Sequence, residues 1–211
     1  MADWVTISSL ATAGGTLVLA VATFSSVRSA NRSARVAELS LLTGLRPVLI
    51  PSREDDPDVR VRFGDDHNLT VAGHGGAVES ADGKLYMAIS LRNGGAGLAV
   101  LHGWRAEALD RDQMQERPDP EEFRRQQLDL YIPAGDTGYW QGAIRDREDP
   151  FHDGISRAIE SGSRVLVDLI YGDHEGGQRT IARFAVGPDP EAGTMRSQII
   201  HYWNLDREDP R

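Results

Sequence analysis

The chain has 211 residues, no cysteine and a formal net charge of −9, from 23 Lys and Arg against 32 Asp and Glu. This length holds one membrane span and one domain of ordinary size. An acidic chain lacks the basic surface that nucleic acid binding requires, so we expect no nucleic acid partner. Without cysteine, the chain forms no disulfide and uses no thiolate as a nucleophile or metal ligand.

Residues 4–27 carry no charged side chain, and Arg28, Arg32 and Arg35 follow within two helical turns. At 1.5 Å per residue, about 24 residues form a helix of roughly 36 Å, which crosses a hydrocarbon core about 30 Å thick. The sequence therefore predicts a single transmembrane helix that contacts the lipid bilayer through residues 4–27.

Two other interpretations of this segment are weaker. A secretory signal peptide begins with basic residues, whereas this chain begins Met1-Ala2-Asp3. A buried helix of a soluble protein shows polar residues at a period of 3.6, and the serines and threonines here are only loosely periodic. Small residues also recur at Ser8, Thr12, Thr16 and Ala20, a spacing that favours helix association in lipid but arises in any Ala/Ser/Thr-rich span.

The charges beside the span predict its orientation. Lys and Arg in short flanking segments stay in the cytoplasm, and all three arginines follow the span, whereas only Asp3 precedes it. We expect a single-pass protein of the cell membrane with its N-terminus outside and its C-terminal domain in the cytoplasm.

A change of pattern near residue 44 divides the chain. Apolar residues at helical spacing continue the helix through residues 28–43, Gly44 suits its end, and Pro47 prevents its continuation. We expect a transmembrane and juxtamembrane helix over residues 1–44 and an antiparallel β-sandwich domain over residues 45–211.

Apolar runs and alternating apolar and polar residues predict strands in the second part. These strands cover residues 47–50, 59–63, 85–91, 98–108, 128–132, 139–144, 165–171, 180–186 and 199–205. Residues 64–83, rich in Gly and Asp, are expected to form a loop.

Two short helices are expected between the strands. One runs through about residue 127, with Asp119 as its cap and Pro120 in its first turn, and the other covers residues 151–161. Many short strands with few helices predict a mainly β fold, an Ig-like antiparallel β-sandwich with one or two short helices, preceded by a single N-terminal transmembrane helix.

Two glycine-rich segments resemble catalytic or phosphate-binding loops. Residues 93–97 (Asn-Gly-Gly-Ala-Gly) precede a strand-like segment rather than a helix, which favours a simple connection between strands over a nucleotide site. Residues 73–77 are similar to the oxyanion loop of esterases, but the chain has no G-x-S-x-G nucleophile motif.

The remaining candidate residues show no metal-binding or catalytic spacing. The six histidines are scattered, and Asp173 is expected to bond its own backbone in an Asx turn. We therefore predict no catalytic, cofactor-binding or metal-ligating residue and no cofactor. The aromatic residues in or beside predicted strands are expected to pack in the core, or else to line a groove for a partner; they are Trp104, Tyr139, Trp140, Tyr171, Tyr202 and Trp203.

The order of these features resembles a group of uncharacterised, single-span, membrane-anchored β-sandwich proteins of high-GC Gram-positive bacteria. The resemblance rests on the span and on Arg46-Pro47, residues 91–99, Tyr171-Gly172-Asp173, residues 201–206 and Pro210-Arg211. It implies an anchored β-sandwich and no particular activity.

These observations favour a bacterial, non-enzymatic β domain that mediates protein–protein interaction at the cytoplasmic face of the membrane. The partner is expected to be another protein or a second copy of this chain. The alternative is a small-molecule sensor or hydrolase with an unrecognised His/carboxylate site.

Overall fold

The computed structural model describes residues 3–110, 114–191 and 193–209 and divides the chain into two compact units, Met1–Gly44 and Leu45–Arg211. We call the second unit the β domain. The two units are described separately below.

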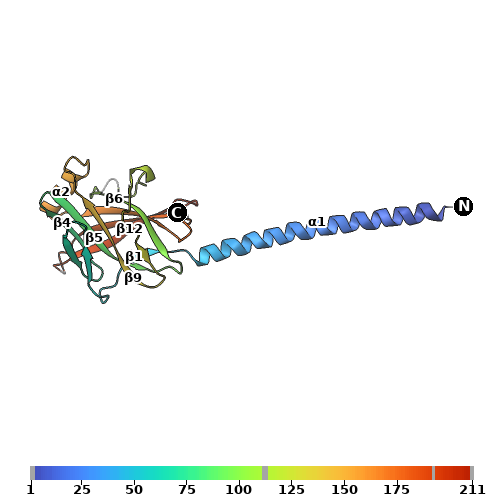
Figure 1. Ribbon diagram of the computed structural model, residues 1–211, viewed down its shortest axis with the longest axis horizontal. Coiled ribbons are helices and arrows are strands. Elements are labelled where there is room, and N and C mark those ends of the chain that lie inside the picture. Colours follow the sequence, from blue (N-terminus) through green and yellow to red (C-terminus); the bar gives the residue numbers. More distant parts are fainter. Residues whose placement is uncertain (1–2, 111–113, 192, 210–211) are drawn as a thin grey trace. The chain divides into compact units, whose positions relative to one another are not determined.

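The first unit is a single α-helix, α1 (Trp4–Gly44), which Figure 1 shows without a break. Its segment Ser8–Leu41 contains an 18-residue window apolar enough to cross a membrane, with a mean hydropathy of 1.6. The hydroxyls of Thr12 and Thr16 donate to the carbonyls of Ser8 and Thr12 at 2.9 Å. These polar groups are therefore satisfied inside the helix, as a hydrocarbon environment requires.

The β domain is built from short strands and two short helical segments. In chain order they are β1 (Leu49–Pro51), β2 (Val59–Arg62), β3 (Asn68–Val71), β4 (Gly76–Ala81), β5 (Lys84–Asn93), β6 (Ala99–Ala108), the 3-10 helix η1 (Pro120–Glu122), β7 (Arg124–Arg125), β8 (Tyr131–Ile132), β9 (Thr137–Ile144), α2 (His152–Glu160), β10 (Val165–Gly172), β11 (Thr180–Pro188) and β12 (Met195–Asn204).

Every strand pairing in the described residues is antiparallel. The first sheet is centred on β5, which pairs with β1 and β4 along one edge and with β9 along the other. The second sheet has the order β12-β11-β10-β6, and β7 and β8 pair with the outer edge of β6. Strands β2 and β3 form a separate hairpin.

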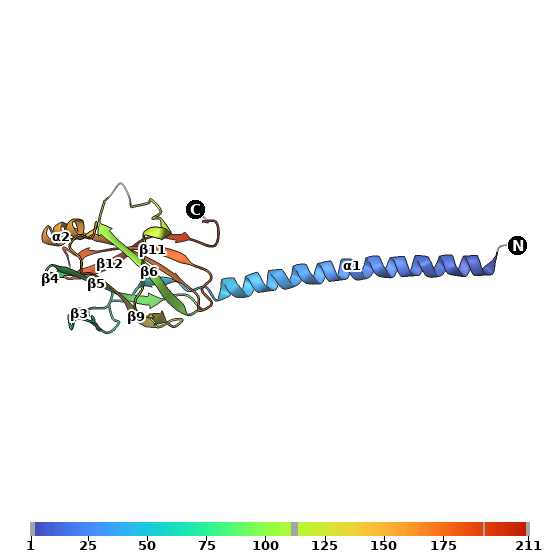
Figure 2. The ribbon, with the colours of Figure 1, turned by 45° about the horizontal axis from the view of Figure 1, so that its top comes forward.

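One hydrophobic core joins the two sheets, whose strands can be followed in Figure 2. Alternate residues of β5, among them Leu85, Met87 and Ile89, share this core with Val167 of β10 and Phe184 of β11. The other face of β5 is covered by the β2–β3 hairpin, and the outer face of β10–β12 carries a smaller cluster around Trp203. The predicted mainly β, antiparallel fold behind one apolar helix is confirmed.

The prediction of a loop over residues 64–83 is wrong, because this segment contains β3 and β4. Leu69 and Val71 are buried beneath Tyr86, so β3 has an apolar face after all. Tight turns lie at Asp66 (φ 60°) and at Asp82–Gly83 (φ 52° and 71°). Because the Gly and Asp of these turns dominate the local composition, the strands beside them are difficult to recognise in the sequence.

The prediction of a helix through residue 127 is also wrong. Asp119 does cap a helical turn by accepting from the Glu121 N–H at 3.0 Å, but only η1 forms. The chain then becomes extended, since β7 pairs with Gly103 and Trp104 of β6. The predicted strand over residues 128–132 is similarly reduced to β8. Helix α2 forms where residues 151–161 were expected to be helical.

Candidate functional site

The two glycine-rich segments serve the fold. Residues 94–98 connect β5 to β6, as the sequence predicted, and the side chain of Asn93 organises the connection. A Cβ at Gly95 or Gly97 would lie 2.2 Å or 1.7 Å from a backbone oxygen of residues 45–46, so the loop closes directly onto neighbouring chain. Gly73 is packed equally closely against the carbonyl of Arg53.

The histidines do not converge. His67 lies 3.6 Å from Glu79, and His152 lies 3.5 Å from Asp153 in a different part of the β domain. Across residues 3–110, 114–191 and 193–209, no group of three or more His, Asp or Glu side chains is arranged to hold a metal ion. Asp173 forms the expected Asx turn, since its Oδ1 accepts from the backbone N–H groups of Glu175 (3.1 Å) and Gly177 (2.8 Å).

The aromatic side chains pack inside the domain and form no exposed groove. Trp140 and Tyr171 lie in the main core with Trp104, whose ring meets that of Trp140 edge to face at 5.5 Å. Trp203 is buried in the cluster on the outer face of the second sheet. Of the two interpretations left open by the sequence, core packing is the one that the structure supports for these residues.

The largest cavity described in the β domain has a volume of about 730 Å³ and lies between the two sheets at their β9 side. Its walls come from β6, from β7 and the three residues after it, from β9 and from the turn after β2. The lining residues are Phe63, Gly64, Asp65, Trp104, Arg124, Arg125, Gln126, Gln127, Leu128, Gln141, Gly142, Ala143 and Arg145.

The cavity follows an unpaired strand edge. Strand β9 pairs with β5 along one side, and no strand of the described residues pairs with its other side. The Gln126 side-chain amide donates to the backbone carbonyl of Gln141 at 3.4 Å, so this carbonyl points away from β5. Because alternate residues of an antiparallel strand present their N–H and C=O groups to the same side, Ala143 also presents its backbone groups to the free edge.

Arginines dominate the polar lining of the cavity. Arg124 lies over the ring of Trp104 and pairs with Asp149, and Arg145 pairs with Asp65 at 3.2 Å. The Arg145 hydrogen bond, followed by that from the Tyr86 hydroxyl, holds the pKa of Asp65 well below its usual range. The carboxylate is thus ionised at neutral pH.

Other polar groups of the lining have no protein partner. Arg125 is exposed and forms no ion pair with any residue in the described part of the chain. The side-chain oxygens of Gln126 and Gln141 are buried without a hydrogen-bond partner, and Gln141 is only 9% exposed. The cavity therefore offers a cation and unused amide groups beside an open backbone edge.

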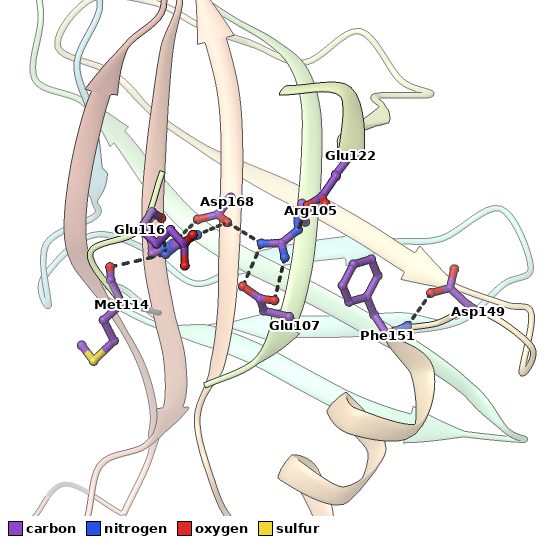
Figure 3. Close-up of polar contacts among 9 residues, drawn as sticks. Arg105, Glu107, Met114, Glu116, Glu122, Asp149, Phe151 and Asp168 are labelled. Carbon is purple, nitrogen blue, oxygen red and sulfur yellow. Dashed lines mark hydrogen bonds and ion pairs between the residues drawn. The ribbon is translucent and has the colours of Figure 1, made fainter. Parts of the chain in front are cut away.

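A buried ionic network, seen in Figure 3, lies on the outer face of the second sheet next to the cavity. Asp168 of β10 accepts two hydrogen bonds from Arg183 of β11, at 2.6 Å and 2.8 Å, and also lies 3.4 Å from Arg105 of β6. Arg105 in turn pairs with Glu107 and Glu122. Since Asp168 stands opposite both arginines in the strand register, the sheet itself sets this row of charges.

The network also positions the cavity arginine Arg124. The guanidinium of Arg105 lies 5.2 Å from the ring centre of Phe151, whose backbone N–H donates to Asp149 at 3.0 Å. Figure 3 shows this sequence of contacts, which ends at Asp149, the partner of Arg124. The Arg124 guanidinium is therefore held between a fixed carboxylate and the Trp104 ring.

The sequence did not predict this cavity. Arg124 and Arg125 fall in the segment that was expected to be a helix, and such a pair is unremarkable in a chain so rich in arginine. The one local signal is the alternation Gly138, Trp140, Gly142 in β9, because small residues on one strand face leave room beside large ones.

Comparisons with known proteins identify no family. No family model matches the chain, and no curated protein is similar enough to be a relative. Among solved structures, it is similar to the crystal structure of a Bordetella pertussis protein described as ApaA, with 12% sequence identity. The match covers 79% of this chain and 98% of that one at a TM-score of 0.23.

Proposed function

We propose that this chain is a single-pass membrane protein whose Ig-like β domain binds a protein partner at the cytoplasmic face and catalyses no reaction. The observation that carries the proposal is the open edge of β9 beside a cavity of about 730 Å³. The segment Ser8–Leu41 supports anchoring, since its uncharged residues 8–27 reach the roughly 20 residues that a membrane span needs.

The lining of the cavity does not favour the alternative of a sensor or hydrolase with a His/carboxylate site. It contains no histidine, and its one carboxylate, that of Asp65, accepts hydrogen bonds from Arg145, Tyr86 and Lys84. A general base needs an accessible lone pair near the reacting atom. A lining of arginine and glutamine suits recognition of a partner instead, because arginine is enriched where binding energy concentrates.

The first prediction concerns topology. A reporter that is active only in the cytoplasm, fused after Arg211, is expected to be active in cells. Replacing Arg28, Arg32 and Arg35 by glutamine and Asp3 by lysine reverses the charge bias across the span, and we expect most of the reporter activity to be lost. The matched control replaces three arginines of the β domain, Arg53, Arg60 and Arg62, by glutamine and should leave the reporter activity unchanged. Activity of a reporter that works only outside the cell, in the native chain, would refute the orientation.

The second prediction concerns the partner. Leu128 is 50% exposed and lines the cavity, so a photoreactive amino acid at this position is expected to crosslink a protein in native membranes. The same label at Arg60, which is exposed on β2 and lies outside the cavity, should not give that product. Identical products from both positions, or none from position 128, would contradict binding at this site.

A further inference from the structure

The β domain is closed along one side and open along the other. On the closed side the Tyr202 hydroxyl of β12 donates to the carbonyl of Leu49 in β1 at 2.7 Å. The backbone N–H of Ser197 donates to the carbonyl of His74 at 3.2 Å, and Gly75 forms a bridge with Arg196. On the opposite side no backbone–backbone hydrogen bond in the described residues joins β9 to β7. The Gln126 side-chain amide, just after β7, donates to the Gln141 carbonyl at 3.4 Å, and the cavity lies there.

The shape of the cavity matches an extended backbone. Residues 141–143 line it consecutively, although their side chains alternate between the two faces of the sheet. A space that touches successive residues of a strand lies off its hydrogen-bonding edge, since only the edge is common to both faces. The stretch from Gln141 to Arg145 is about 14 Å long at 3.4 Å per residue, which accommodates a strand of about five residues.

The cavity reaches only one end of β9, which limits the site to this stretch. Gln141, Gly142, Ala143 and Arg145 line the cavity, whereas residues 137–140 do not. A Cβ at Gly138 would lie 2.8 Å from the side chain of Ile132 in β8, so Ile132 fills the core beneath the other end of β9.

The charges of the lining indicate the character of the added segment. Arg125 has no ion pair with a described residue, whereas Arg124 pairs with Asp149 and Arg145 pairs with Asp65. The lining and its direct partners thus carry three arginines and Lys84 against Asp65 and Asp149 in a chain of net charge −9. An acidic segment complements this surface, whereas β9 of a second copy would bring the same arginines into repulsive contact.

We propose that the free edge of β9, from Gln141 to Arg145, binds an extended acidic segment of a partner protein, which joins the first sheet as an additional antiparallel or parallel strand. The proposal rests on the proposed function and specifies its partner. Backbone hydrogen bonds to Ala143, and to Gln141 where the incoming strand replaces the Gln126 amide at the carbonyl, provide the affinity, and Arg125 selects acidic side chains. The unpartnered oxygens of Gln126 and Gln141 are further acceptors within the same space.

A purely protective role is the competing explanation. Charged residues beside an edge strand prevent unwanted pairing with other chains, and Arg125 and Arg145 meet that description. The two explanations differ in their consequences, since a protective edge binds no strand and a docking edge binds an acidic one.

The test uses the full chain in nanodiscs and a fluorescent peptide, N-acetyl-Glu-Val-Glu-Val-Glu amide, with binding measured by fluorescence anisotropy. We expect saturable binding that is lost when alternate peptide nitrogens are methylated, because methylation removes the N–H donors and keeps the charge. The Arg125→Glu variant is expected to bind at least tenfold more weakly, whereas Arg60→Glu, the same charge change outside the cavity, should bind normally. Thermal unfolding of both variants should match the native chain, since both side chains are exposed.

Three results would overturn the proposal. Equal binding of the methylated peptide would show that the cavity takes anions without strand pairing. Equal binding by the Arg125→Glu and Arg60→Glu variants would place the site elsewhere. Absence of binding at millimolar peptide would leave edge protection as the role of the arginines. In each case, a specific crosslink from position 128 would still support a protein partner. These results would therefore contradict strand binding at β9 without contradicting the proposed function.

Discussion

Replacing Asp168 by alanine is expected to lower the free energy of unfolding by about 3–5 kcal/mol, because it removes the carboxylate that the buried Arg183 guanidinium pairs with. The Asp168 and Arg183 side chains are only 1% and 2% exposed, and two hydrogen bonds join them. Arg183 also donates to the carbonyls of Met114 and Glu116 and lies over the ring of Trp203. Urea denaturation of the native chain and the variant measures the loss.

Two further variants separate charge from packing. The double variant Asp168→Leu/Arg183→Met is expected to be more stable than Asp168→Ala, because a buried ion pair replaced by apolar groups costs less than one that is broken. In this variant the carbonyls of Met114 and Glu116 lose their hydrogen bonds from Arg183. A protease should therefore cut the segment 114–116 faster in the double variant than in the native chain. Arg62→Ala, which removes the exposed ion pair between Arg62 and Asp66, is the control and should change stability by less than about 1 kcal/mol. A loss this small for Asp168→Ala as well would show that the buried network contributes little.

Replacing Asn93 by alanine is expected to destabilise the β domain by about 3 kcal/mol or more, since each unpaired buried polar group costs about 1–3 kcal/mol. The side chain is fully buried and satisfies four backbone groups. Its oxygen accepts from the N–H groups of Val48 (3.1 Å) and Gly95 (3.0 Å), and its nitrogen donates to the carbonyls of Gly97 (2.7 Å) and Ile132 (2.9 Å).

Asn93→Asp tests the direction of these bonds. Aspartate keeps the shape but places a second acceptor against the carbonyls of Gly97 and Ile132, so we expect a loss as large as that of Asn93→Ala. The control is Asn68→Ala, since Asn68 is exposed and bonds only the nearby carbonyl of Asp66, and its change should stay within about 0.5 kcal/mol. Full stability of Asn93→Asp would contradict the assigned hydrogen bonds.

The sequence pattern correctly predicted those helices, strands and turns whose own residues are enough to determine their conformation. Helix α1 and strands β5, β6, β10 and β11 follow from uncharged or alternating runs, and the turn of Asp173 follows from its own side chain. The errors lie where tertiary contacts decide. Residues 124–125 are extended because β6 pairs with them, and β3 is a strand because its apolar side chains pack under Tyr86.

The cavity and the ionic network depend on strand order, which one sequence does not contain. Gln141 and Arg125 belong to different sheets, and Phe63 reaches the cavity from the β2–β3 hairpin. The pair Asp168 and Arg183 was more accessible to prediction, since the predicted strands 165–171 and 180–186 flank the predicted turn at Asp173, and their pairing sets which residues stand opposite one another. The contact of Arg105 with Asp168 needed the additional knowledge that β6 lies beside β10.

The closed side of the β domain also affects how the chain acquires its fold. The hydrogen bonds between β12 and the segments around Leu49 and His74 join residues more than a hundred positions apart. Contacts of such sequence separation form late, since loop closure must precede any gain from them, and proteins rich in them fold in milliseconds to seconds. During synthesis, β1 to β5 therefore emerge from the ribosome long before β12 exists to cover them. The first sheet has to remain soluble in this incomplete state, and the charged, twisted β2–β3 hairpin that covers one face of β5 is available early enough to protect it.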